Sequence, residues 1–259
     1  MTTSHDTLFI GGQWVPPSSS SGIEVRNAST GEVIGSVPEA AEADVDAAVA
    51  AARRAFDDPS GWSAWTPTER AAALERLAAE LETRAQEIGR LVSMQNGMPI
   101  ALSPIIEGMT PVGTLRYMAS LLASSPVEEE TARFLGGDLV IRHEPIGVIA
   151  GIVPWNYPQT LSSFKYAPAL AAGNTIVLKP SPETVLDSYV FAEAVVAASI
   201  PPGVINIVPG GRDRPEPVLR HAGQQRPDLL RGHPHPRAAL PLRRGRRRLR
   251  RLRLVAPGR

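Results

Sequence analysis

The sequence predicts an α/β fold: a partial doubly wound (Rossmann-like) parallel sheet, with N-terminal helices and an antiparallel β-extension. Three apolar runs, IGVIAGIVP, TIVLKP and VINIV, have the composition of strands that are buried on both faces. Helical segments at 158–172 and 185–198 separate these runs, and the connections are short. Strand–helix–strand–helix–strand is half of a doubly wound sheet, and its crossovers are right-handed. We therefore expect a truncated sheet whose last strand, VINIV, lies uncovered at an edge.

The N-terminal segments are predicted to be short strands. LFIGGQWV, residues 8–15, indicates two strands around a Gly-Gly pair, and residues 16–22 form a loop of Pro, Ser and Gly. Residues 25–37 are two extended pieces joined by a Ser-Thr-Gly turn. Further along, LVIRHEP alternates as an exposed, paired strand does.

Helices are predicted between these strand regions. A helix from Glu42 has one apolar face formed by Val45, Val49, Ala52 and Phe56. A longer helix begins at Thr66-Pro67-Thr68-Glu69, which offers a capping hydroxyl, a proline at the first position and a glutamate at the third. It ends at Asn-Gly-Met-Pro, and another helix is expected between Val112 and Ala123.

Polar and aromatic groups follow each of the three buried strands. Trp155-Asn156 follows the first, Lys179-Pro180-Ser181 the second, and Gly210-Gly211 the third. Ligands of open α/β sheets bind beyond the carboxyl ends of the strands. If the strands are neighbours, the three groups lie along one edge and form a candidate binding site.

Each of these groups also has a structural interpretation. Asn156 has a neutral amide that could stabilise an oxyanion, or it is simply a turn residue. Trp155 could pack under a ligand ring or plug the end of the sheet. Lys179 could bond a ribose or phosphate, or extend along the surface. The chain uses 25 Arg and only 2 Lys, Lys165 and Lys179, both in this segment, which favours a functional lysine. The Gly-Gly pair is a weak signal, because no GxGxxG follows.

The run GVIAGIVPWNYPQTLSSFKYAPALAAGNTIVLKPSPETV resembles the aldehyde dehydrogenase superfamily. FIGGQWV and the NGMP after the long helix resemble it too, and the resemblance covers residues 8 to about 211. It implies an oxidoreductase that oxidises an aldehyde to a carboxylic acid with NAD or NADP. It also implies a homo-oligomer in the full-length family.

The resemblance assigns roles to individual residues. Asn156 matches the asparagine of the oxyanion hole, Lys179 matches the lysine that binds the adenosine ribose, and Lys165 matches a lysine on the helix below the active site. The nicotinamide wall is matched by Ile152, Val153, Pro154 and Trp155, and the cofactor neighbours are completed by Ser181 and Gly210. Pro182 stands where NAD-using members carry an acid, and Glu183 follows it, so NAD is only weakly preferred over NADP.

The catalytic half of the family pattern is missing from this sequence. It has no cysteine and no ELGGK run with the general-base glutamate. The covalent mechanism of the family needs a thiolate nucleophile. We therefore expect this chain to be inactive as an aldehyde dehydrogenase. A non-catalytic nucleotide-binding or oligomer-forming module is the alternative. No metal site is expected.

Residues 212–259 differ in chemistry from the rest. They carry 15 Arg against 3 acidic residues, a net charge of +12, whereas residues 1–211 have a net charge of −11. Clustered arginine is typical of nucleic-acid-binding arms, but Arg, Pro, Gly, Ala, Leu and His are also what a GC-rich gene yields in a wrong frame. We favour the frameshift and predict a disordered tail. With no signal peptide or membrane span recognised, the expected location is the cytoplasm.

Overall fold

A five-stranded sheet of order β3-β2-β10-β9-β8 forms the centre of the computed structural model. The structure describes residues 3–124, 128–132 and 138–211. Strands β8, β9 and β10 are parallel to one another, and β2 runs antiparallel to β10. The predicted α/β class is therefore confirmed, with these strand bounds: β2 Leu8–Ile10, β3 Gln13–Val15, β8 Val148–Ile152, β9 Thr175–Lys179 and β10 Ile205–Ile207.

The strand order corrects two expectations. VINIV was expected at an uncovered edge, but β10 lies between β9 and β2, because the N-terminal hairpin β2–β3 joins the sheet on that side. The first run, expected to be buried on both faces, instead forms β8 at the end of the sheet. Four of the five β8 residues are only half-buried, whereas every residue of β9 and β10 is buried.

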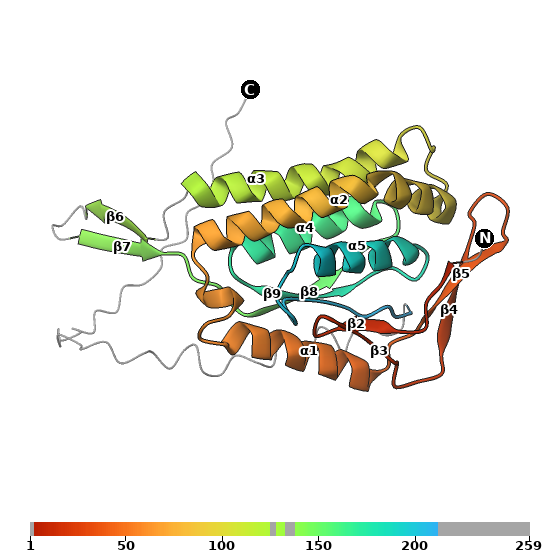
Figure 1. Cartoon of the computed structure of the whole chain (residues 1–259), viewed down its shortest axis with the longest axis horizontal. Coiled ribbons are helices and arrows are strands. Elements are labelled where there is room, and N and C mark those ends of the chain that lie inside the picture. Colours follow the sequence, from red (N-terminus) through yellow and green to blue (C-terminus); the bar gives the residue numbers. More distant parts are fainter. Residues whose placement is uncertain (1–2, 125–127, 133–137, 212–259) are drawn as a thin grey trace, which may run out of the picture. The chain divides into compact units, whose positions relative to one another are not determined.

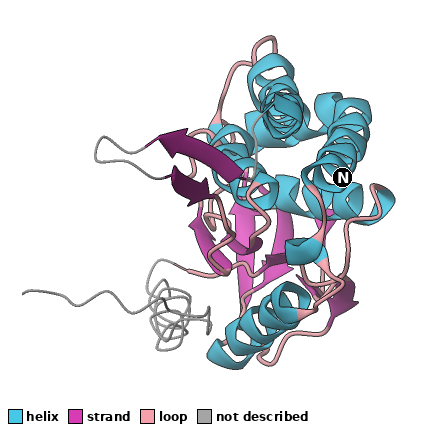
Figure 2. Ribbon diagram, turned by 90° about the vertical axis from the view of Figure 1, so that its left-hand side faces the viewer, coloured by secondary structure: helices cyan, strands magenta, loops and turns pink. Residues whose placement is uncertain are grey.

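Helices cover both faces of the sheet (Figures 1 and 2). Helix α1 (Glu42–Asp57) packs on one face against β8, β9 and β10. Helices α4 (Pro158–Ala171) and α5 (Leu186–Ala197) contact the sheet from the other side. Helix α2 (Pro67–Asn96) and helix α3 (Thr110–Ser124) then pack outside α4, and α2 also contacts α5. The main hydrophobic core lies between the sheet and these helices.

The ends of α2 are set by the predicted local chemistry. The Thr66 hydroxyl accepts from the Glu69 N–H, and the Glu69 carboxylate accepts from the Thr66 N–H, which completes a capping box. Gly97 adopts a left-handed conformation with φ of 78° at the C-terminal end, where a side chain would be strained.

A six-residue π-helix, η2 (Pro104–Met109), joins α2 to α3 and was not predicted. It lies unusually close to α2. A Cβ atom on Gly108 would come within 2.5 Å of the Ala85 carbonyl oxygen, and one on Gly89 within 2.5 Å of Pro104. The two glycines thus allow η2 to lie close to α2. This close approach determines how deeply Glu107, the residue before Gly108, is buried.

Two smaller sheets complete the described residues. One has the order β1-β5-β4, formed by Thr3–Ser4, Val33–Pro38 and Gly22–Arg26. The other is the hairpin of β6 (Glu128–Ala132) and β7 (Asp138–Arg142), and Figure 1 shows it apart from the five-stranded sheet. The predicted paired strand LVIRHEP is therefore β7. The 3₁₀ turn η1 (Trp62–Ala64) links α1 and α2.

No helix in the described ranges is long and apolar enough to cross a membrane. The predicted tail, residues 212–259, lies outside the described residues.

Candidate functional site

The three strand ends meet, as the sequence predicted. Strands β8 and β9 are in parallel register with Ile152 opposite Lys179, and β9 and β10 pair with Leu178 opposite Ile207. The ladder continues one residue further on each side: the Val153 N–H donates to the Lys179 carbonyl oxygen at 3.0 Å, and Val208 to Leu178 at 2.9 Å. The candidate groups after β8, β9 and β10 therefore lie along one edge of the sheet.

The segment after β8 turns sharply into α4. Tyr157 precedes the helix and Pro158 occupies its first position, which suits the fixed φ of proline. Trp155 is 52% exposed and Asn156 is also exposed, so both side chains face outward from the turn. The Asn96 amide, at the end of α2, donates to the backbone oxygens of Asn156 at 3.1 Å and Trp155 at 3.4 Å. This bond fixes the backbone of the turn and leaves the Asn156 side-chain amide available as a donor.

Lys179 is buried at the centre of the site. Its side chain is bridged to the third strand end, since Nζ donates to the Gly210 carbonyl oxygen at 2.6 Å. The same loop is held from the other side by the Gly211 N–H, which donates to the Glu39 carboxylate at 3.0 Å. Burial lowers the pKa of Lys179, and the negative charges of Glu183 and Glu39 partly oppose that shift. An ammonium group has three donors, so two remain after the bond to Gly210.

The residues after Lys179 form a local acidic element. The Ser181 hydroxyl donates to the Glu183 carboxylate. The negative charge of Glu183 acts on Lys179, although the family resemblance predicts the acid one residue earlier, where Pro182 stands. The other predicted residues, Ile152, Val153 and Pro154, are buried or half-buried between the strand and the turn. Lys165 is half-buried on α4, and no hydrogen bond within the described ranges connects it to the strand ends.

A buried acid lies beneath the first turn of α4. The Glu107 carboxylate, from η2, accepts from the backbone N–H of Gln159 at 2.8 Å and of Thr160 at 3.3 Å. It also contacts the Thr160 hydroxyl at 2.9 Å. Burial raises the pKa of Glu107, and these hydrogen bonds only partly offset the shift. The helix that follows Asn156 is therefore held from below by a side chain from another segment.

A second buried acid, Asp187, connects three helices. Its oxygens accept from the side-chain amides of Gln95 on α2 at 2.8 Å and Gln159 on α4 at 2.6 Å. The Gln95 amide oxygen in turn accepts from the Leu186 N–H at the start of α5 at 2.9 Å. Burial raises the pKa of Asp187 to about 6, and the nearby Glu107 adds to the increase.

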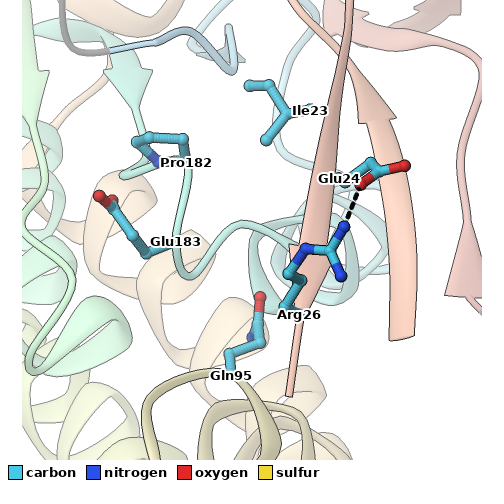
Figure 3. Close-up of a pocket in the computed structure, with 6 residues that line it drawn as sticks. All are labelled: Ile23, Glu24, Arg26, Gln95, Pro182 and Glu183. Carbon is cyan, nitrogen blue, oxygen red and sulfur yellow. Dashed lines mark hydrogen bonds and ion pairs between the residues drawn. The ribbon is translucent and has the colours of Figure 1, made fainter. Parts of the chain in front are cut away.

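A hollow of about 310 Å³ opens beside the loop that follows β9 (Figure 3). It lies between that loop and strand β4, and its walls are Ile23, Glu24, Arg26, Gln95, Pro182 and Glu183. Arg26 donates to the Glu24 carboxylate at 2.7 Å. The hollow thus combines one cation and two carboxylates at the acidic side of the candidate site.

Sequence reasoning missed the residues that support the site from neighbouring segments. The sequence indicates for Asn96 only a place in a helix stop, and Gln95 and Asp187 carry no local signal. A glutamate inside an otherwise apolar or small stretch, such as PIIEGM, was the one available hint for Glu107.

Comparison with known proteins agrees with these observations. Residues 14–225 match the aldehyde dehydrogenase family. Geranial dehydrogenase of Castellaniella defragrans is 47% identical over 223 residues, covering 86% of this chain and 46% of that protein. Aminoacetaldehyde dehydrogenase of Pseudomonas aeruginosa is 42% identical over 197 residues, covering 75% of this chain and 39% of that protein.

Solved structures give the same result. The Mycobacterium tuberculosis aldehyde dehydrogenase in complex with NAD⁺ superposes with a TM-score of 0.79 at 41% identity, covering 84% of this chain and 45% of that one. A mutant of aldehyde dehydrogenase C from Pseudomonas syringae with NAD⁺ and octanal gives 0.73 at 39% identity, covering 79% and 41%. The chain spans less than half the length of these relatives. The chain belongs to the aldehyde dehydrogenase family.

Proposed function

We propose that this chain forms the cofactor-binding side of an NAD(P)-dependent aldehyde dehydrogenase. The observation that carries the proposal is the meeting of Asn156, Lys179 and Gly210 at one edge of the parallel sheet. Bound NAD(P) would supply the hydride acceptor for aldehyde oxidation. The two similar solved structures named above are both complexes with NAD⁺, which supports the same cofactor here.

The residues present fit part of a dinucleotide. Lys179 keeps two ammonium donors after its bond to Gly210, enough for a pair of ribose hydroxyls. Trp155, about half exposed after β8, offers an apolar ring face against which a flat ring could pack. The seat for the pyrophosphate is normally a helix N-terminus. The sequence after Gly211 reads Arg-Asp-Arg-Pro-Glu-Pro, in which the prolines remove N–H donors and disfavour a helix. We therefore expect binding weaker than the low micromolar range.

Asn156 is the proposed oxyanion donor. Its side-chain amide is exposed, and Asn96 holds its backbone oxygen. The turn is therefore fixed while the Asn156 side-chain amide stays available to donate to a substrate oxygen. A neutral amide keeps its proton at any physiological pH and can bind negative charge that develops on a carbonyl oxygen. The nucleophile that would create this charge is missing, since the 259 residues contain no cysteine. We propose that this chain by itself does not oxidise aldehydes.

The activity test is NADH formation with the purified chain and octanal or geranial, the aldehydes named in its relatives. We expect no rate above a control without protein. Sustained NADH formation that survives repurification would contradict the proposal. Titration calorimetry with NAD and NADP tests the cofactor part, and a low-micromolar dissociation constant lost in Lys179→Ala would show a complete site.

The tail, the partners and the location are proposals of the same kind. Translating the gene downstream of Gly211 in its two other frames tests the frameshift: an ELGGK run and a cysteine there support it, and stop codons without these motifs overturn it.

Self-association through the exposed Val140 and Ile141 of the β6–β7 hairpin is proposed, and sedimentation velocity tests it. The proposed location is the cytoplasm.

A further inference from the structure

Glu107 supports the Asn156 turn in a way that no part of the family resemblance suggested. It is fully buried on η2, and Oε2 accepts from the first free N–H groups of α4, those of Gln159 and Thr160. These N–H groups have no partner within their own helix. Because α4 begins at Pro158, two residues after Asn156, the position of its first turn determines the position of the Asn156 turn.

The hydrogen atoms around Glu107 can be counted. The Thr160 hydroxyl oxygen lies 2.9 Å from the Ile106 carbonyl oxygen and 2.9 Å from Glu107 Oε1. A threonine hydroxyl has one hydrogen to donate. If Glu107 were ionised, one of these two short contacts would join two acceptors. If Oε1 carries a proton, it donates to Thr160, Thr160 donates to Ile106, and both contacts are hydrogen bonds.

The surroundings of Glu107 favour the uncharged form. Glu107 lies close enough to Asp187 of α5 to raise the pKa of that acid, so this buried ionisable neighbour is also acidic. Helix α3 carries Arg116, which is exposed and bonded to Glu82 of α2 at 2.6 Å. Helix α4 carries Lys165, which forms no ion pair within the described ranges. A buried carboxylate without a cation is costly, and burial indeed raises the pKa of Glu107.

We propose that Glu107 is a protonated carboxylic acid that acts as a positioning residue, holding the first turn of α4 and thereby the Trp155–Asn156 turn. Asn96, at the end of α2, holds the same turn because its side-chain amide donates to the backbone oxygens of Trp155 and Asn156. The turn is therefore fixed by one neutral donor on one side and one neutral acid beneath it. The value of this positioning for catalysis rests on the proposed function, but the positioning itself does not.

The protonation state is tested by Glu107→Gln in the full chain. Glutamine reproduces the acid, since its oxygen can accept from the two N–H groups and its amide can donate to Thr160. We expect its urea midpoint at pH 5 to equal that of the wild type, while Glu107→Ala lowers the midpoint clearly. Glu87→Gln, an exposed glutamate on α2, is the matched control and should change nothing. A glutamine variant as unstable as the alanine variant would overturn the proposal.

The pH profile gives a second readout. A group whose folded pKa is raised contributes stability that is present below its unfolded pKa, and this contribution is lost as the pH rises through the folded pKa. The urea midpoint of the wild type should thus fall between pH 5 and pH 9 relative to the midpoint of Glu107→Gln. Because Glu107 also raises the pKa of Asp187, the two proteins are compared in an Asp187→Asn background, where the difference between them reports Glu107. An unchanged difference across this range would contradict a protonated Glu107.

The positioning role is tested by ¹⁹F NMR with 5-fluorotryptophan. The chain has four tryptophans, and Trp155→Phe assigns the signal of the turn. We expect Glu107→Ala to shift or broaden the Trp155 signal while the buried Trp62 signal stays in place, and Glu107→Gln to restore the wild-type spectrum. If the alanine variant does not fold, Glu107→Met, which preserves the volume, replaces it. An unmoved Trp155 signal in a folded variant overturns the positioning role. These measurements use neither aldehyde nor NAD, so their failure is distinct from failure of the proposed function.

Discussion

Strands β8 and β9 are neighbours with similar sequences but different environments. Both are apolar, and Ile149 of β8 lies directly opposite Ile176 of β9. Ile176 is fully buried, whereas Ile149 is only half-buried, because β8 is the last strand of the sheet within the described residues. An apolar sequence therefore shows that a strand can be buried, whereas the position of the strand in the sheet decides how much of it is buried.

The same contrast continues into the site. Lys179, at the end of β9, is buried and bonded to the next strand end. Trp155 and Asn156, after the edge strand β8, are exposed, and Asn96 holds this turn through their backbone oxygens. One side of the site is therefore part of the core, and the other side is a supported surface turn.

The largest expected effect is a difference between the two isoleucines. Ile176→Ala removes a fully buried side chain and should lower the free energy of unfolding by about 2–5 kcal/mol. Ile149→Ala removes one that is partly in water and should cost roughly half as much. Urea unfolding followed by circular dichroism measures both values. Equal losses would show that β8 is as buried in solution as β9, which requires a partner strand on its free side.

The next effect concerns Asp187 of α5. It accepts a hydrogen bond from Gln159 and so connects α5 to α4, the helix that follows the Trp155–Asn156 turn. Its pKa is raised to about 6 by burial, so the folded chain binds a proton that the unfolded chain, with a pKa near 3.9, releases. The stability gained is complete below about pH 4 and is lost as the pH rises through 6, on the order of 2–3 kcal/mol.

Unfolding midpoints between pH 4.5 and 8, in wild type and in Asp187→Asn, measure this contribution. The wild type should lose stability relative to the asparagine variant across this interval. Parallel profiles for the two proteins would mean that Asp187 does not titrate there.

The smallest effects compare the two sides of the site directly. Lys179→Met keeps the apolar stem but leaves the buried Gly210 carbonyl without its donor, and should cost about 1–3 kcal/mol. Asn156→Ala should change the free energy of unfolding by less than about 0.5 kcal/mol, because its side chain is exposed. The same denaturation experiment compares them. A larger loss for Asn156 than for Lys179 would reverse the assignment of the buried and surface sides.

By itself, the sequence determined the local features of this protein. The capping box at Thr66 and Glu69, the glycine stop at Gly97 and the proline entry into α4 all depend on residues a few positions apart, and each was found where it was predicted. The three apolar runs likewise became β8, β9 and β10, and their parallel pairing brought the predicted strand ends together. The roles of Asn156 and Lys179 remain predictions that the experiments above address.

Only the tertiary structure decided the strand order and the support of the turn. Phe9, near the N-terminus, pairs with Ile207 and makes β10 an inner strand. Gln95 reaches Asp187 across 92 residues, and Glu107 reaches Gln159 across 52. Local periodicity contains no information about such partners, because burial and hydrogen bonding depend on which distant segments pack together. A buried acid such as Glu107 is therefore recognised only when the helix above it is in place.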